Sequence, residues 1–279
     1  MGKYLFFDVD GTLIDFSGKI PRSAIEALKA VRKAGHRIFL CTGRSVCQLQ
    51  DALKEITFDG MVAASGGYVV CDGEEIFHHY MPVSDVEKVV RQFRDDDTMF
   101  SCQMTDRAIL EKDNRERFIE LFRRRGTVSE EQIQKVFPES RRVAAVEDYI
   151  DRIEKIIYNE SIRTVGELRE LFGSTIEVTA MSFDNTDAYS GEITTYGINK
   201  AYGIQKVLDY YGGTVEDTIG FGDGPNDFEM IEFVHTGVVM GNGIDELKAK
   251  ADYVTTSIME DGIKHALEHL KLIPQLAEA

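Results

Sequence analysis

The sequence predicts an α/β protein whose core is a parallel sheet and which carries an inserted α+β domain. Strand-like apolar runs alternate with helix-like amphipathic runs up to about residue 64, and the same alternation resumes from residue 198. Between these two regions the alternation is lost. Because alternating strands and helices form parallel sheets with helices on both faces, we expect the two outer regions to build one discontinuous domain.

The first outer region begins with an apolar strand and continues in βα steps. Gly35 ends its first helix, and Asp72-Gly73 marks the turn of a hairpin at 69–80. The predicted strands are 3–7, 37–41 and 60–64, and the predicted helices are 22–34 and 45–56.

The middle region reads as a separate unit, and the βα order then returns. The middle helices are 85–94, 114–125 and 162–172, and its strands are 99–104, 107–111, 154–158, 176–179 and 183–188. The later helices are 199–211, 225–233, 244–251 and 261–270, and the later strands are 218–221, 237–240 and 252–254. We therefore expect a Rossmann-like core formed by 1–82 and 187–279, interrupted by an inserted α+β domain at 83–186.

The composition is that of a globular, strongly acidic protein. Of its 279 residues 43% are hydrophobic, and 48 Asp and Glu against 32 Lys and Arg give a formal net charge of -16. Such a charge repels nucleic acid and anionic lipid, so neither is expected as a partner. An anionic small molecule would need its own Lys, Arg, backbone amides or metal in the site.

Cysteine spacing and the lack of long apolar runs predict a soluble, cytoplasmic protein. The four cysteines show no C-x-x-C spacing, and a chain of this size needs no disulfides. The N-terminal apolar run is too short for a signal peptide, and no run approaches the ~20 apolar residues of a membrane span. The sequence leaves the oligomeric state open and favours a monomer by a small margin.

Two carboxylates follow the first strand. Asp8 and Asp10 lie two residues apart, so their side chains point the same way on an extended chain, and Gly11-Thr12 supplies a turn behind them. Because neighbouring acids repel, this pair indicates either a bound cation or a nucleophile working with an acid/base group. The structural alternative is a core strand that ends in a polar turn.

A second polar motif, Thr42-Gly43-Arg44, follows the second strand and precedes a predicted helix. The Thr42 hydroxyl and the backbone N–H groups at such a helix N-terminus form a phosphate-binding site, which the helix dipole reinforces. An ordinary Thr-Gly turn is the alternative.

The most specific motif is Gly222-Asp223-Gly224-Pro225-Asn226-Asp227, after an apolar strand. Its glycines allow a tight bend that projects Asp223 and Asp227 towards one place, and carboxylate oxygens are what Mg²⁺ prefers. The alternative is a glycine-rich loop with helix-capping acids. Lys200, which begins the helix after the insertion, supplies a cation to such a site, unless it is a solvated surface lysine.

In their order and spacing these motifs resemble the haloacid dehalogenase superfamily over the whole chain. The long insertion before Lys200 resembles the large cap of its Cof-type phosphatases. The C-terminal segments 239–242, 251–255 and 260–263 are also similar to theirs.

The resemblance implies a Mg²⁺-dependent phosphatase acting on small phosphate monoesters, above all phosphorylated sugars, with cofactor phosphates as further substrates. Asp8 would attack phosphorus and form an aspartyl-phosphate, while Asp10 would protonate the leaving group and then activate water. The implied phosphate-binding residues are Thr42, Gly43, Lys200 and Asn226. The implied metal-binding residues are Asp8, the main-chain carbonyl of Asp10, Asp223 and, in support, Asp227.

Substrate recognition is expected in the cap, between about residues 84 and 185. Arg115, Arg117 and 123–125 could bind a second phosphate, or they form a solvated, salt-bridged helix face. Asp184, Asn185 and Asp187 could contact a polyol. One departure from the family pattern is Ser65-Gly66-Gly67, where relatives commonly have Asn-Gly-Ala, which puts substrate orientation in doubt.

Two alternatives to a phosphatase remain. A phosphomutase shares the Asp8-x-Asp10 pair and would move phosphate without releasing it. A phosphometabolite-binding protein would keep the fold without turnover, although all the expected catalytic side chains are present.

Overall fold

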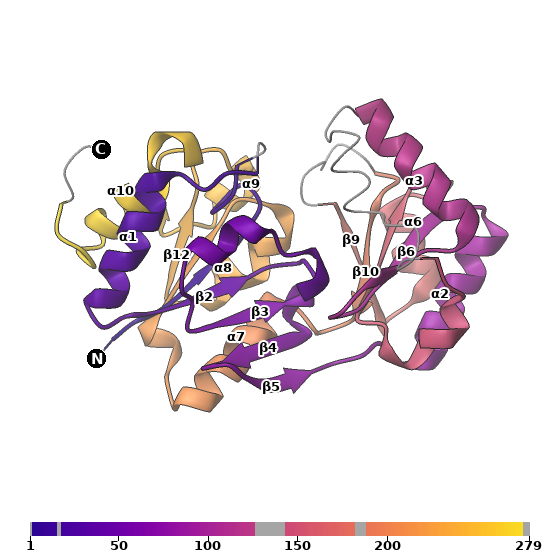
Figure 1. The fold of residues 1–279 in the computed structure, drawn as a ribbon, viewed down its shortest axis with the longest axis horizontal. Coiled ribbons are helices and arrows are strands. Elements are labelled where there is room, and N and C mark those ends of the chain that lie inside the picture. Colours follow the sequence, from indigo (N-terminus) through magenta and orange to yellow (C-terminus); the bar gives the residue numbers. More distant parts are fainter. Residues whose placement is uncertain (1, 16–17, 126–142, 182–187, 276–279) are drawn as a thin grey trace. The chain divides into compact units, whose positions relative to one another are not determined.

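The structure is a computed structural model of the 279-residue chain, and it describes residues 2–15, 18–125, 143–181 and 188–275. The chain forms two compact units (Figure 1). The first comprises residues 1–44, 49–78 and 198–279, and the second comprises 45–48 and 79–197. The second unit includes residues 191–195, which the sequence analysis counts with the core.

An eight-stranded sheet forms the centre of the first unit, in the order β13-β12-β11-β1-β2-β3-β4-β5. Neighbouring strands are parallel from β13 to β3, and β4 and β5 extend the sheet as an antiparallel hairpin. The strands are β1 (Tyr4–Phe7), β2 (Arg37–Cys41), β3 (Gly60–Ala63), β4 (Tyr68–Cys71), β5 (Glu74–His78), β11 (Thr218–Gly222), β12 (Thr236–Val239) and β13 (Tyr253–Val254).

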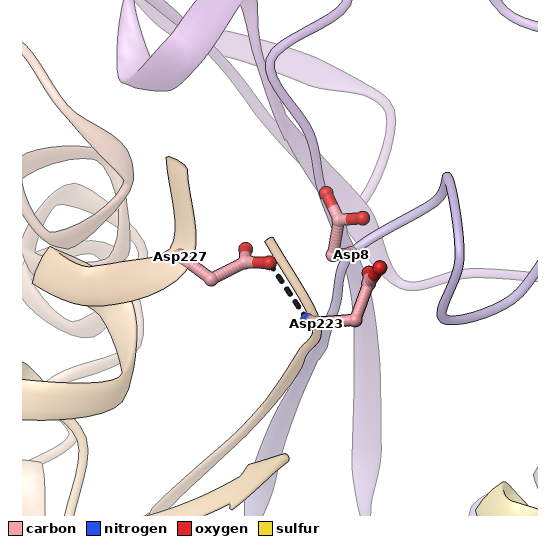
Figure 2. Close-up of side chains that lie close together, drawn as sticks. All are labelled: Asp8, Asp223 and Asp227. Carbon is pink, nitrogen blue, oxygen red and sulfur yellow. Dashed lines mark hydrogen bonds between the residues drawn. The ribbon is translucent and has the colours of Figure 1, made fainter. Parts of the chain in front are cut away.

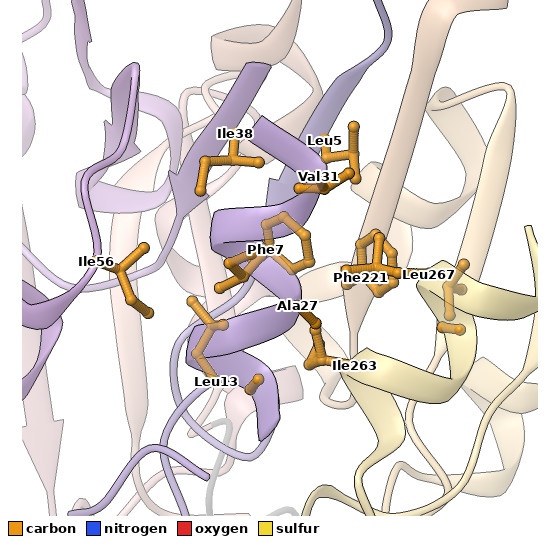
Figure 3. Packing of buried hydrophobic residues seen from close by; sticks show 14 of the residues in the cluster. Leu5, Phe7, Leu13, Ala27, Val31, Ile38, Ile56, Phe221, Ile263 and Leu267 are labelled. Carbon is orange, nitrogen blue, oxygen red and sulfur yellow. The ribbon is translucent and has the colours of Figure 1, made fainter. Parts of the chain in front are cut away.

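Helices cover both faces of this sheet (Figure 1). Helices α1 (Arg22–Lys33) and α10 (Gly262–His269) pack on one face, and α7 (Lys200–Tyr211), α8 (Phe228–Phe233) and α9 (Asp245–Lys248) on the other. On the first face Phe7 of β1 stacks on Phe221 of β11 with 4.4 Å between ring centroids (Figure 3). Ala27 and Leu267 add apolar side chains from the two helices. The predicted fold class is thus confirmed.

The central position of β1 brings the polar motifs together. β1 pairs in parallel with β11 on one side and β2 on the other, with Phe7 opposite Phe221 and Leu40. Parallel neighbours end at the same edge of a sheet, so the residues that follow these three strands meet there.

The predicted helix at 45–56 is wrong. Two short 3₁₀ turns, Val46–Gln48 and Asp51–Glu55, take its place, because Gln50 between them adopts an extended backbone. Only Leu53 and Ile56 of this segment are buried hydrophobics of the core, and their packing overrides a modest helix propensity. Thr42-Gly43-Arg44 therefore does not precede an α-helix, and the predicted helix dipole is absent there.

The second unit contains a five-stranded antiparallel sheet in the order β7-β6-β8-β10-β9. Its apolar face packs on α2 and α6, while α3 contributes a smaller cluster with Met99 and Leu110. The strands are β6 (Met99–Gln103), β7 (Ala108–Ile109), β8 (Lys155–Asn159), β9 (Ile176–Ala180) and β10 (Gly191–Thr195), and the helices are α2 (Val83–Asp95), α3 (Lys112–Arg125) and α6 (Val165–Phe172).

Strand β10 was not predicted from the sequence, and most of the strand expected at 183–188 lies outside the described residues. No helix within the described ranges is both long enough and apolar enough to cross a membrane.

Candidate active site

A buried cluster of charged side chains lies where β1 and β11 end. The Nζ atom of Lys200 is 2.5 Å from Oδ1 of Asp8 and 2.5 Å from Oδ1 of Asp227. Asp8, Asp227 and Lys200 are 4%, 0% and 2% exposed. Figure 2 shows that Asp8 and Asp223 project from neighbouring strand ends, with Asp227 beside them. The structure thus brings together four of the residues that the sequence singled out.

The loop after β11 fixes Asp227 by hydrogen bonds to its own backbone. Oδ2 of Asp227 accepts hydrogen bonds from the N–H groups of Asp223, at 2.9 Å, and Gly224, at 3.0 Å. A 3₁₀ turn, Pro225–Asp227, carries the side chain into this position. Asp227 therefore braces the loop that presents Asp223.

The turn after β1 is built to accommodate Asp223. Gly11 has φ +84°, and a Cβ atom on it would lie 2.1 Å from Oδ2 of Asp223. The Thr12 hydroxyl donates a hydrogen bond to Oδ1 of Asp223 at 2.9 Å. Glycine is needed here both for the left-handed backbone and for the close approach of the carboxylate.

Lys200 enters the site from the first turn of α7. Asn199 caps this helix, because its Oδ1 accepts a hydrogen bond from the N–H group of Tyr202 at 3.0 Å. Burial disfavours the Lys200 ammonium group, but the carboxylates of Asp227 and Asp8 outweigh this effect and raise its pKa. Lys200 therefore remains charged inside the protein.

The carboxylates of the site are only partly neutralised. Burial raises the pKa of Asp8 well above its usual range, against the opposing effect of Lys200. Burial and the charge of Asp227 raise the pKa of Asp223 to about 7. Three carboxylates face one ammonium group, so full ionisation would leave an excess of two negative charges, and the raised pKa values of Asp8 and Asp223 reflect the cost of that excess.

The same three carboxylates could hold a divalent cation. Ligand oxygens of Asp8, Asp223 and Asp227 lie within 4.8 Å of one another. Mg²⁺ takes hard oxygen ligands of this kind and would offset the excess charge. The donor set therefore fits the magnesium ion that the sequence analysis predicted.

The loop after β2 brings Thr42 and Arg44 to the same edge of the sheet, where the loop after β3 contacts it. Thr42 is 1% exposed, and its Oγ1 accepts a hydrogen bond from the N–H group of Arg44 at 3.1 Å. Ser65 donates its N–H to the carbonyl of Thr42 at 3.2 Å, which ties the two loops together. The Arg44 side chain pairs with the carboxylate of Asp10 through two hydrogen bonds of 2.6 and 2.7 Å.

The segment that departs from the family pattern is strained. Ser65 has φ 54°, and Gly66 has φ +97°. A Cβ atom on Gly66 would lie 1.9 Å from the carbonyl oxygen of Asn199, the residue before Lys200. Glycine at this position therefore lets the start of α7 approach the loop after β3.

Sequence reasoning assigned no site role to Thr12 or Asn242. Asn242 donates to the carbonyl of Gly11 at 2.8 Å and accepts the N–H of Ile258 at 2.9 Å, so it clamps the turn that carries Thr12. The signal for Asn242 was its place after the strand β12, whose carboxyl end shares the edge of the sheet with β1. The structure pairs Lys200 with two aspartates, and the predicted phosphate-binding roles of Gly43 and Asn226 stay predictions.

Three of the arginines singled out on α3 form salt bridges, as the surface alternative expects. Arg117 pairs with Asp97 at 3.0 Å, Arg124 with Glu160 at 2.7 Å and Arg123 with Glu120 at 4.0 Å. The candidate polyol contacts at 184, 185 and 187 lie outside the described residues.

Fold and site together define an α/β enzyme with an aspartate-rich centre, and comparison with known proteins identifies its family. The sequence profile of the haloacid dehalogenase-like hydrolases matches residues 5–267. The chain belongs to this family, which confirms the resemblance that the motifs predicted.

Two relatives that align along nearly the full length of both chains are named phosphatases. The chain is 29% identical to the Bacillus subtilis protein YkrA, named as a phosphatase with no substrate given, over 97% of this chain and 98% of YkrA. It is 26% identical to the Bacillus subtilis 5-amino-6-(5-phospho-D-ribitylamino)uracil phosphatase YcsE, over 96% of this chain and 95% of the relative. These relatives confirm the predicted enzyme class, a phosphatase.

A solved structure extends the likeness to the fold. The structure of the HAD subclass IIB sugar phosphatase BT4131 aligns with a TM-score of 0.78 and 27% identity, covering 97% of this chain and all of the other.

Proposed function

We propose that the protein hydrolyses small phosphate monoesters, above all phosphorylated sugars and related polyols, with Mg²⁺ as its cofactor. The observation that carries this proposal is the buried Lys200 between Asp8 and Asp227, with a carboxylate oxygen of Asp223 within 4.8 Å of theirs. Such a site can attract a phosphoryl group only together with a cation, because the protein is otherwise strongly negative.

Asp8 is the proposed nucleophile. Its carboxylate attacks phosphorus in line and forms an aspartyl-phosphate as the bond to the leaving oxygen breaks. Asp10 gives a proton to that oxygen and then takes one from the water that cleaves the acyl phosphate. Dividing hydrolysis in this way requires two carboxylates in different surroundings, and Asp8 is buried while Asp10 is a third exposed.

The proposed phosphate contacts surround this nucleophile. Lys200 and the Thr42 hydroxyl hold oxygens of the transferred group, together with Gly43 and Asn226. Asp8, the main-chain carbonyl of Asp10, and Asp223 would hold Mg²⁺, with Asp227 supporting the loop. When bound, the ion supplies positive charge against the phosphoryl oxygens.

The second unit is the proposed cap that selects the substrate. The relatives suggest a polyol or sugar phosphate, since YcsE carries the name of a phosphoribitylaminouracil phosphatase and BT4131 that of a sugar phosphatase. All four cysteines are free thiols, in keeping with the cytoplasmic location that we propose. A monomer stays a prediction.

The test is phosphate release from sugar phosphates, nucleotides, pyridoxal phosphate and an aryl phosphate, each with Mg²⁺ and with chelator. Release should require the metal, and Asp8→Asn should lower kcat by at least about 1,000-fold. Asp209→Asn is the matched control, because Asp209 lies exposed on α7 and pairs only with Gln205 among the described contacts.

Other outcomes would favour the alternatives. Transfer of phosphate between positions of one sugar, without net release, would identify a phosphomutase. Binding of phosphorylated compounds without turnover in Mg²⁺, or comparable rates for Asp8→Asn and the unchanged protein, would contradict the proposed mechanism.

A further inference from the structure

Arg44 forms a bidentate ion pair with the carboxylate of Asp10. Its Nε donates to Oδ2 at 2.6 Å and one terminal nitrogen donates to Oδ1 at 2.7 Å. Two parallel hydrogen bonds of this kind fix the orientation of a carboxylate as well as its distance. The side chain of Arg44 is 32% exposed and that of Asp10 is 38% exposed, and ion pairs so exposed contribute little to stability. What the contact supplies is therefore mainly geometry.

The backbone of Arg44 is anchored on both sides. Its N–H donates to Oγ1 of Thr42 at 3.1 Å, and its carbonyl accepts the N–H of Ala64 at 2.8 Å. Since Oγ1 of Thr42 already accepts this bond, its own hydroxyl hydrogen is left to be donated elsewhere. One short loop thus presents both a donor for phosphate and the guanidinium group that holds Asp10.

The backbone that carries Asp10 is held separately. The N–H of Gly11 donates to the carbonyl of Ile14 at 2.9 Å, and Asn242 binds the carbonyl of Gly11. These bonds fix the main chain but leave the side-chain torsions of Asp10 to be set by its partner. An acid/base group must lie within hydrogen-bond reach of the proton that it transfers, so these torsions matter for the reaction.

We infer that Arg44 is a positioning residue that holds the Asp10 carboxylate in the orientation required for proton transfer. This inference rests on the proposed function, in which Asp10 serves both displacements. In the first displacement, protonated Asp10 gives its proton to the leaving oxygen and becomes a carboxylate. The two N–H groups of the Arg44 guanidinium are complementary to the two oxygens of this carboxylate. In the second, this carboxylate takes a proton from water while the water oxygen attacks phosphorus and the bond to Asp8 breaks. The proton gained from water is the one given in the next turnover.

Arg44→Ala should lower kcat on an alkyl phosphate by about 10- to 100-fold, a part of the effect of acid/base catalysis. KM should change by less than about 3-fold, because the lost contact is made to Asp10 rather than to substrate. Arg44→Lys should restore kcat only in part, since an ammonium group offers no planar fork.

The decisive experiment combines Arg44→Ala with Asp10→Asn in single-turnover assays. If Arg44 acts through Asp10, adding Arg44→Ala to the Asp10→Asn enzyme should cost less than about 3-fold. Losses that multiply in the double variant, or a raised KM with kcat retained, would overturn the inference. No turnover by the unchanged protein would instead overturn the proposed function and this inference with it.

A matched arginine controls for the loss of an ion pair. Arg32, in the last turn of α1, makes a comparable two-bond contact with Asp59, directly before β3, at 3.2 and 2.9 Å. Arg32→Ala should keep kcat within about 2-fold, because it changes stability but leaves the acid/base group in place. A fall in kcat equal to that of Arg44→Ala would show a general structural effect and refute the positioning role.

Discussion

Replacing Asp223 by asparagine should stabilise the metal-free protein at alkaline pH. Burial and Asp227 raise the pKa of Asp223 from 3.8 to about 7, so the folded state binds the proton more tightly than the unfolded chain does. The stability that this group contributes is fully present below pH 3.8 and is lost as the pH rises through about 7. The complete loss corresponds to about 4 kcal/mol as an upper bound.

The assay is urea unfolding of both proteins in chelator. The free energy of unfolding of the variant should exceed that of the unchanged protein by up to about 4 kcal/mol near pH 8. By the linkage relation, this difference should fall to roughly 2 kcal/mol near pH 5. Asparagine keeps a carbonyl oxygen for the hydrogen bond from Thr12. Asp209→Asn should change the free energy of unfolding by less than about 0.5 kcal/mol at either pH.

Adding Mg²⁺ should narrow the difference in the free energy of unfolding between the two proteins. At about 100 times its dissociation constant, the ion should stabilise the unchanged protein by about 2.7 kcal/mol and the Asp223→Asn variant by much less. The reasoning would be refuted if the variant gained nothing at alkaline pH in chelator, or if both proteins gained equally from the metal. The first result would mean that the charge of Asp223 is already compensated within the chain, and the second that Asp223 does not bind the metal.

Two further changes test the packing around the site. Lys200→Met should destabilise the protein by about 3 to 5 kcal/mol in urea unfolding, because it leaves Asp8 buried without its cation. Lys206→Met on the same helix is a half-buried control that loses two cation–π contacts, with Phe77 and Tyr202, and it should cost about 2 kcal/mol or less. Gly66→Ala should lower the midpoint temperature of thermal unfolding, since the φ of Gly66 is +97° and the new methyl group would lie 1.9 Å from the carbonyl oxygen of Asn199. An unchanged midpoint would show that the loop after β3 and the start of α7 can separate without cost.

The sequence predicted the site well where the prediction needed only the order of strands. Asp8 and Asp223 follow strands that any parallel α/β arrangement brings to one edge, so their proximity could be expected before the structure was known. The bridging position of Lys200 could not be expected in the same way. It depends on the capped start of α7 and on the absence of a side chain at Gly66.

Predictions failed where local pattern and tertiary packing disagree. Leu53 and Ile56 have helical spacing, but extended Gln50 interrupts the segment, so packing rather than propensity decides its conformation. The contact between Arg44 and Asp10 was also beyond the sequence. Two charged residues 34 positions apart could each have faced solvent, and only the paired ends of β1 and β2 bring them together.

Asp8 and Asp10 follow the same strand but lie in different surroundings. Asp8 is buried, contacts Lys200 and lies near two further carboxylates, whereas Asp10 is a third exposed and contacts an arginine. Different surroundings are what assign different roles to paired acids in enzymes. A buried carboxylate with one cation at its side is suited to attack phosphorus from a fixed position. A more exposed carboxylate held by a fork can exchange protons with water and with a leaving group. The division of labour proposed for this pair therefore follows from the depth and the partner of each side chain, because their sequence positions are nearly the same.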